Sequence, residues 1–135
     1  GITVEADIVY DETDYEKCEM IVLPGGLPGA DNLRANARVR ELTVTVFENG
    51  GFVSAICAAP RVLGELGLLK GKKAICYPEF ETYLEGAEIA DTRVVKDGNV
   101  ITAIGMGASV EFALELVKAL KGGAVSEKIA EGIFA

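Results

Sequence analysis

The chain has 135 residues, and half of them are hydrophobic, which is enough for one domain over residues 1–135 with a real core. Thirteen Lys and Arg against 21 Asp and Glu give a net charge of −8, which argues against nucleic acid or an anionic membrane as a partner. The chain has no histidine, so Ser-His-Asp and Cys-His catalysis and imidazole-bound zinc are excluded within it.

The three cysteines, Cys18, Cys57 and Cys76, suit no disulfide framework, because their number is odd and no Cys-x-x-Cys pair occurs. This usage predicts a reducing, cytoplasmic compartment. The best apolar stretch, residues 52–69, is interrupted by Arg61 and Glu65, so we expect no membrane span. The N-terminus lacks the basic region of a signal peptide.

The first part of the chain predicts a strand followed by a helix. Residues 2–10 alternate loosely, which indicates an edge strand or an extended lead-in, and residues 11–17 favour a short helical turn. The apolar run 20–23 stops at Pro24-Gly25-Gly26, as a central parallel strand buried on both faces would. Asp31 is the expected cap of a helix that runs to about Glu48 and ends at Asn49-Gly50-Gly51.

The second part repeats the alternation of strand and helix. A strand at 52–56 leads through Cys57 into a helix from Pro60 to about Leu66, and a short strand follows at 73–76. Asp97-Gly98 between the apolar runs 92–95 and 100–104 predicts a hairpin. The last elements are a largely buried helix at about 109–121 and a short helix over 124–134.

This order of elements predicts an α/β sandwich with a mostly parallel sheet. In such sheets, sites form in the crevice at the carboxyl ends of the strands. The chemistry is therefore expected around Gly25-Gly26, Cys57, Tyr77 and residues 105–107, which follow the predicted strands.

Cys57 is the residue that points most directly to chemistry, because it lies between a predicted strand and the start of a helix, with Ala58 and Ala59 after it. This is the layout of a nucleophile elbow, in which a tight turn exposes the side chain above the sheet. The helix N-terminus would favour the thiolate, and the amide of Ala58 would face a developing oxyanion. The structural alternative is a small apolar side chain that fills the core.

The other candidate residues also have a structural alternative. Gly26 would supply a second oxyanion amide or only end a strand. Tyr77 would bring its hydroxyl to the pocket or only cover a sheet edge. Gly105-Met106-Gly107-Ala108 lacks the third glycine of a dinucleotide fingerprint, because Val110 occupies that place, and is interpreted as a close-packed turn. Cys18 and Cys76 are interpreted as structural.

Several segments resemble the ThiJ/PfpI superfamily, in the branch of the parkinsonism-associated protein deglycase and its bacterial relatives. The resemblance covers essentially the whole chain. It is most specific at the Pro-Gly-Gly segment and at the elbow. The segments that carry it are Ile21-Val22-Leu23-Pro24-Gly25-Gly26, Gly29-Ala30-Asp31-Asn32-Leu33, Ser54-Ala55-Ile56-Cys57-Ala58-Ala59-Pro60, Arg93-Val94-Val95-Lys96-Asp97-Gly98, Gly105-Met106-Gly107 and Glu111-Phe112-Ala113-Leu114.

The resemblance implies a flavodoxin-like three-layer sandwich that forms a homodimer. It implies that Cys57 is the nucleophile, that the amides of Gly26 and Ala58 bind the oxyanion, and that Gly25, Tyr77 and Pro78 line the pocket. The activities that it implies are conversion of methylglyoxal or glyoxal to hydroxy acids and removal of early glycation adducts, with no cofactor and no metal. Ala58 stands where the protease branch has a histidine, which argues against peptidase activity.

Three departures from the family's pattern stand out. Tyr77 occupies a position where many relatives have histidine, and Ala103-Ile104 replaces a small polar and basic pair. The family's first strand, helix and second strand, which carry a glutamate that contacts the nucleophile, have no match here. We therefore expect either a fragment of a longer product or a separate N-terminal peptide in the same assembly, because loss of a central strand would leave unpaired edges.

Three functions are compatible with these residues. The first is a glyoxalase or deglycase-type enzyme in which Cys57 attacks an aldehyde substrate and an acid or base outside this chain moves the proton. The second is an oxidative-stress sensor or chaperone without turnover, in which Cys57 is oxidised. The third is an inactive remnant kept for packing or partner binding. We rank the enzyme first, because the elbow and both oxyanion amides occur together.

Overall fold

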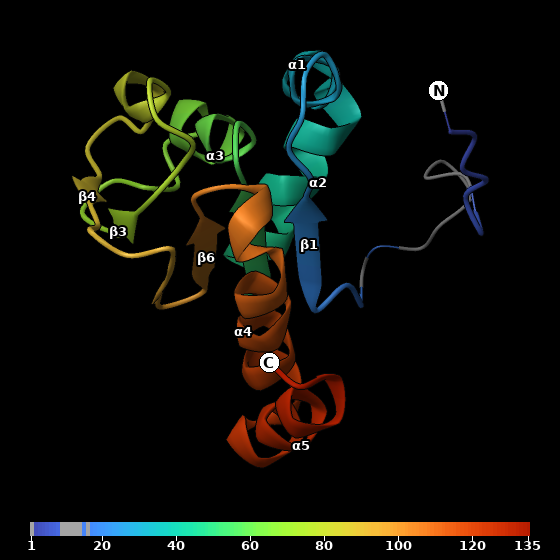
Figure 1. The fold of residues 1–135 in the computed structure, drawn as a ribbon. Helices are drawn as coiled ribbons and strands as arrows, with labels where there is room; N and C mark the ends of the chain where they lie inside the picture. The colour runs from blue at the N-terminus through green and yellow to red at the C-terminus, as the bar shows by residue number, and fades with distance from the viewer. Residues whose placement is uncertain (1, 9–14, 16) are drawn as a thin grey trace.

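The computed structural model describes residues 2–8, 15 and 17–135. Residues 2–8 contain no helix or strand and lie apart from the sheet, which fits an extended lead-in (Figure 1). Most of the helical turn expected at 11–17 lies outside the described residues. The described elements are β1 (Met20–Leu23), α1 (Gly29–Ala35), α2 (Ala37–Glu48), β2 (Phe52–Ile56), α3 (Pro60–Glu65), β3 (Lys73–Ala74), η2 (Glu81–Tyr83), β4 (Glu88–Ile89), β5 (Val94–Asp97), β6 (Val100–Ala103), η3 (Met106–Ala108), α4 (Ser109–Lys121) and α5 (Gly123–Ile133).

The main sheet has the strand order β1-β2-β6-β5. β1, β2 and β6 are parallel, and β5 is antiparallel to β6 through the hairpin that Asp97-Gly98 predicts. Leu23 pairs with Ala55, and Ile56 pairs with Ala103, so the three parallel strands end at one edge of the sheet. The turns after these strands therefore meet there, as the sequence predicts.

Helices cover both faces of this sheet (Figure 1). On one face, Val53 and Ala55 pack with Val46 of α2 and Leu63 of α3 in the larger buried cluster. On the other face, Ile101 and Ala103 pack with Phe112 of α4 in a second cluster. The side chains of the sheet thus pack against helices on both of its faces, as expected for a parallel sheet between helices. The predicted three-layer α/β sandwich with a mostly parallel sheet is confirmed.

β1 has the predicted bounds but not the predicted position. Within the described chain it pairs only with β2 and lies at the edge of the sheet. Val22 is 41% exposed, so the expectation of a central strand buried on both faces is wrong here. A short apolar run cannot by itself distinguish a strand that is covered on both faces from one at an edge.

The single helix expected from Asp31 to Glu48 is two helices. Asn36 has an extended backbone (φ −79°, ψ 111°), which ends α1. Its side-chain oxygen accepts hydrogen bonds from the amides of Arg38 and Val39, at 3.0 and 3.1 Å, so Asn36 caps α2. Asp31 lies inside α1 and forms an ion pair instead of a cap. The predicted end at Asn49-Gly50-Gly51 is confirmed by a glycine in the left-handed region, Gly50 at φ +80°.

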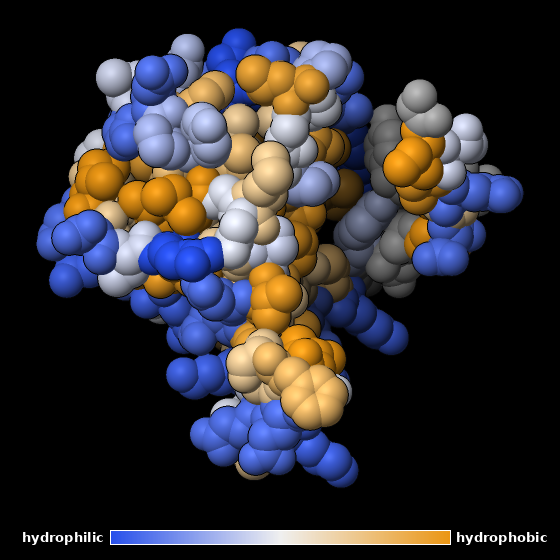
Figure 2. All heavy atoms as spheres, in the orientation of Figure 1, coloured by the Kyte–Doolittle hydropathy of each residue, from blue (hydrophilic) through white to orange (hydrophobic). Residues whose placement is uncertain are grey.

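Two other expectations need correction. The strand expected at 73–76 is only Lys73–Ala74, and it pairs with β4 in a separate sheet. α4 has the expected bounds, but Phe112 is its only buried residue. The reason is that α5 covers the apolar face of α4 opposite Phe112 only in part. It leaves a groove of about 220 Å³ between the helices, lined on α4 by Val110, Ala113, Leu114 and Val117. Figure 2 shows the resulting hydrophobic surface over α4 and α5.

Candidate active site

Cys57 has the backbone of a nucleophile elbow. It follows β2 directly and has a φ of +64°, in the left-handed region that non-glycine residues rarely adopt. The surrounding chain fixes this conformation at both sides of the residue. The Cys57 amide donates to the carbonyl of Ala103 at 2.9 Å, and the Cys57 carbonyl accepts from the amide of Tyr77, also at 2.9 Å. Backbone strain of this kind, held by neighbouring strands, is typical of functional sites.

The turn after β1 lies against Cys57. A Cβ atom built on Gly25 would be 2.5 Å from the Cβ of Cys57 and 3.4 Å from its Sγ. No residue with a side chain fits there without a shift of the elbow. Gly26 is free of contacts at its Cβ position but has a φ of +86°, which also favours glycine. Glycine is therefore required at the two positions for different reasons, lack of space at Gly25 and a positive φ at Gly26. Both glycines bring backbone close to the thiol.

The amides of Gly26 and Ala58 are available as donors. Within the described part of the chain, neither amide donates a hydrogen bond to a backbone carbonyl or to a side chain. Ala58 is buried beside the elbow, whereas the turn at Gly26 is partly open to solvent. Buried amides are usually paired, so a free amide next to a strained cysteine is consistent with a donor kept for a ligand.

A pocket of about 320 Å³ opens above Cys57. It is lined by Gly25, Gly26, Ile56, Cys57, Met106 and Ser109. Of the predicted residues, the structure thus brings Gly25, Gly26 and Cys57 together at one hollow. Met106, which is 85% exposed, belongs to the turn 105–107 that was expected at this edge of the sheet, whereas Ser109 was not predicted. The apolar lining suits a small organic molecule.

The resemblance implies that Tyr77 and Pro78 also line the pocket. Neither is among the residues that line the hollow above Cys57. The Tyr77 ring lies next to Gly105, whose Cβ would be 3.4 Å from the ring, and half of the tyrosine is exposed. The structure therefore places Tyr77 at the rim, tied to Cys57 through its backbone amide. Its predicted role in lining the pocket stays a prediction.

Comparison with known proteins shows the family to which this arrangement belongs. The model of the DJ-1/PfpI family matches residues 1–119. The chain belongs to the DJ-1/PfpI family. This confirms the resemblance inferred from the Pro-Gly-Gly segment and the elbow.

Relatives within the DJ-1/PfpI family support the same assignment. The chain is 38% identical to Protein dj-1beta of Drosophila melanogaster over 134 residues, which is 98% of this chain and 72% of that protein. It is 34% identical to Deglycase TK1284 of Thermococcus kodakarensis, over 90% of this chain and 74% of that protein. The solved structure of oxidized Toxoplasma gondii DJ-1 superposes with a TM-score of 0.93 at 33% identity, over 99% of this chain and 73% of that chain.

The chain is shorter than the family members that it matches. It covers 62% of Protein DJ-1alpha of Drosophila melanogaster and 60% of the Parkinson disease protein 7 homolog of Danio rerio. It covers 28% of Protein DJ-1 homolog B of Arabidopsis thaliana. The activities and partners of those whole proteins therefore enter only as proposals for this chain.

Cys76 differs from Cys57 in its surroundings. It is almost fully buried in the larger core cluster. Burial, together with the nearby charges of Glu81 and Cys57, raises the pKa of the Cys76 thiol from 9.0 to about 12. Cys76 is therefore a neutral thiol at physiological pH, in agreement with its predicted structural role. Cys18 donates its S–H to the carbonyl of Met20 at 3.2 Å and is half-buried.

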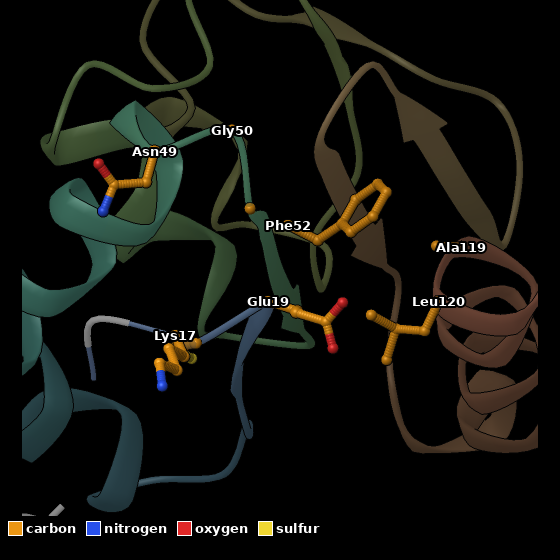
Figure 3. A pocket seen from close by; sticks show the side chains of 9 residues that line it. Lys17, Glu19, Asn49, Gly50, Phe52, Ala119 and Leu120 are labelled. Atoms are coloured by element: carbon orange, nitrogen blue, oxygen red, sulfur yellow. The ribbon is translucent and has the colours of Figure 1, made fainter. Parts of the chain in front are cut away.

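Another hollow of about 350 Å³ lies away from Cys57 (Figure 3). Glu19 and Gly51 immediately precede β1 and β2, and Leu120 is near the end of α4, so this hollow is at the amino ends of the strands. Its polar side chains, those of Lys17, Glu19 and Asn49, precede β1 and β2 in the chain, whereas Cys57 follows β2. It does not combine with the pocket above Cys57.

Residues 2–8, 15 and 17–135 contain no group of three or more His, Cys, Asp or Glu side chains that could hold a metal ion. Among the helices described here, none combines the length and the apolar character needed to cross a membrane. The pocket above Cys57 is the site on which the functional argument rests.

Proposed function

We propose that the chain is the cysteine-bearing part of a cofactor-independent glyoxalase or deglycase-type enzyme. The observation that carries this proposal is the placement of Cys57, at φ +64°, beside a pocket bordered by glycine backbone. The amides of Gly26 and Ala58, which are unpaired in the described structure, complete the arrangement. The name of the similar Deglycase TK1284 is a second line of support.

The proposed reaction begins with attack of the Cys57 thiolate on the aldehyde carbon of methylglyoxal. A C–S bond forms, and the electron pair of the carbonyl double bond moves to its oxygen, which the amides of Gly26 and Ala58 would hold. A proton then moves between the two carbons through an enediol and gives a thioester of the hydroxy acid. Water releases lactate and restores the thiol, so methylglyoxal and water balance lactate without an external oxidant.

The proton transfer needs an acid or base, and the described residues that line the pocket offer no carboxylate or histidine for it. In the proposed whole assembly, the glutamate of the family's N-terminal segment supplies this group, either from a longer product or from a separate peptide. The exposed edge of β1 is consistent with a strand added there. We propose that residues 1–135 form one domain of a cytoplasmic homodimer, in line with three free thiols.

The size and character of the pocket support the proposed substrate class. A volume of about 320 Å³ is at the small end for ligand sites, and it suits a small aldehyde or the carbonyl end of a glycated side chain. The exposed thioether of Met106 and the hydroxyl of Ser109 would contact that end of the substrate.

The test compares Cys57→Ser with Cys18→Ser in the full-length protein. Methylglyoxal loss and lactate formation are followed together. We expect Cys57→Ser to abolish both, and Cys18→Ser to retain both, because Cys18 lies at the amino end of β1. Full activity of Cys57→Ser would rule out the proposed nucleophile.

A second candidate function is oxidative sensing by Cys57 without turnover. Cys57 is half-exposed and borders a pocket, whereas Cys76 is buried with a raised pKa, so peroxide should discriminate between the two thiols. Mild peroxide is expected to add oxygen to Cys57 and to spare Cys18 and Cys76. Equal oxidation of all three cysteines would argue against a sensor.

A further inference from the structure

Arg61 is a charged residue in a place where charges are rarely found. It is the second residue of α3, four positions after Cys57, and its side chain is only 5% exposed. Its Nη2 donates to the Oδ1 of Asp31 at 2.6 Å, while Asp31 itself is 47% exposed. Buried arginines need such a partner, because an unpaired buried charge is very unfavourable.

The guanidinium of Arg61 also meets two aromatic rings. Its central carbon lies 5.1 Å from the ring centroid of Phe80 and 5.9 Å from that of Tyr83. Both rings belong to the segment that follows Tyr77. Within cation–π distance, the faces of these rings attract the charge. The backbone of the same segment contacts α3, since a Cβ on Gly64 would be 2.0 Å from the carbonyl oxygen of Tyr83.

Arg61 thus joins three segments, and each of them carries one part of the site. Asp31 belongs to α1, whose Ala30 amide donates to the carbonyl of Gly26 at 2.8 Å. Arg61 is on α3, three residues after Ala58, whose amide faces the pocket in the proposed site. Phe80 donates its amide to the carbonyl of Tyr77, whose own amide holds the carbonyl of Cys57.

We propose that Arg61 is a positioning residue, which, anchored by Asp31, holds the amides of Gly26 and Ala58 at a fixed separation around the Cys57 thiol. This inference rests on the proposed function of that site. Misplacement of a reacting group by about 1 Å can cost about a hundredfold in rate. A single planar group with three fixed neighbours is suited to prevent such a displacement.

Two observations separate this role from simple stabilisation. The Nε of Arg61 is buried and has no hydrogen-bond partner among the described residues, so the arrangement is not the most favourable one for stability. In addition, α1 and α3 are already joined at the surface by the ion pair of Arg34 and Glu65, at 3.3 Å. Unlike the Arg34–Glu65 ion pair, Arg61 also contacts the segment after Tyr77.

The experiment uses the full-length protein with the variants Arg61→Met, Arg61→Lys and Asp31→Asn, and Arg34→Met as the matched control. The readouts are thermal unfolding, the pH–rate profile of Cys57 alkylation by iodoacetamide, and kcat and KM for methylglyoxal. We expect Arg61→Met to slow alkylation and to lower kcat by about tenfold or more, with KM changed less than about threefold. Arg61→Lys is expected to restore only part of the loss, and Arg34→Met to behave like the parent protein.

Asp31→Asn distinguishes positioning from the effect of charge alone. This variant keeps the positive charge of Arg61 but removes its anchor, and Asp31 is exposed enough for the change to be tolerated. Positioning predicts slower alkylation in Asp31→Asn, whereas an effect of charge alone predicts an equal or faster rate. An unchanged or faster rate, or full recovery in Arg61→Lys, would overturn the proposal. If the parent protein shows no methylglyoxal turnover, the proposed function fails, and the alkylation rates still decide the role of Arg61.

Discussion

Gly25 and Cys57 are in contact through backbone that has no room for another methyl group. A Cβ on Gly25 would lie 2.5 Å from the Cβ of Cys57 and 2.8 Å from the carbonyl oxygen of Ile56. The turn after β1 and the elbow after β2 therefore fix each other's position. This contact brings the neighbouring Gly26 amide to the pocket above the thiol.

Gly25→Ala should therefore lower stability and slow the reaction of Cys57, although it adds only one methyl group. The new methyl group must displace either turn, and overpacking of this kind costs about 1–3 kcal/mol. We expect lower stability and at least tenfold slower alkylation of Cys57, measured by chemical unfolding and by mass spectrometry. Gly29→Ala is the matched control, because a Cβ there meets nothing within 4 Å and its φ is not positive. Equal effects of the two variants would contradict the contact as described.

The left-handed backbone of Cys57 predicts a conflict between stability and activity. A non-glycine residue in this region costs about 1–2 kcal/mol, which glycine does not incur. We expect Cys57→Gly to be at least as stable as Cys57→Ala, although both are inactive. Ala55→Gly, in the regular part of β2, should lose stability by contrast. Thermal unfolding of the three variants tests this prediction. If Cys57→Gly were clearly less stable than Cys57→Ala, the backbone at position 57 would not be strained.

The raised pKa of Cys76 predicts a loss of stability in alkaline solution. Below pH 9 the thiol is protonated in the folded and the unfolded chain, and its contribution to stability is fully present. Between pH 9 and about 12 the unfolded chain releases the proton while the folded chain keeps it, so the free energy of unfolding falls. The slope from this group approaches about 1.4 kcal/mol per pH unit.

Urea unfolding of the parent protein and Cys76→Ala across this pH range measures the effect. The variant should be less stable at neutral pH, because a buried side chain is lost, but it should show a flatter dependence on pH above 9. Cys18→Ala serves as the control and should keep the parent's slope. Identical slopes for the parent and Cys76→Ala would mean that another group causes the alkaline loss.

The cap at Asn36 predicts a local loss of stability. Its side chain accepts from two amides of α2, and removal of such a cap costs about 1 kcal/mol. We expect Asn36→Ala to lower the unfolding free energy by that amount, whereas Asn32→Ala inside α1 should change it little. Similar losses for both variants would contradict the boundary between α1 and α2.

Sequence patterns marked residues of the candidate site because these residues follow strand ends that local signals identify. Pro24 directly after β1, Cys57 directly after β2 and the Asp97-Gly98 hairpin are each visible within a few residues, and the parallel pairing brings the first two together. The oxyanion roles of Gly26 and Ala58, which the turn and the elbow suggest and the resemblance also implies, remain proposals. The left-handed φ of Cys57 agrees with the predicted elbow.

Expectations failed where the deciding partner is distant in the sequence. Asp31 has the pattern of a helix cap, but Arg61, thirty residues later, takes its carboxylate, and Asn36 provides the cap. The burial of α4 depends on how α5 covers it, which the periodicity of α4 does not contain. β4 was not predicted, because the hydropathy pattern of two residues cannot distinguish a strand from a loop.

The central claim is that Cys57 is the nucleophile of an aldehyde-converting enzyme. Its most direct test is to alkylate the full-length protein with limiting iodoacetamide at neutral pH, and to map the modified cysteines while the remaining methylglyoxal activity is measured. We expect activity to fall in proportion to modification of Cys57, Cys18 and Cys76 to stay largely unmodified, and methylglyoxal to slow the alkylation. Activity that survives complete modification of Cys57 would contradict the central claim.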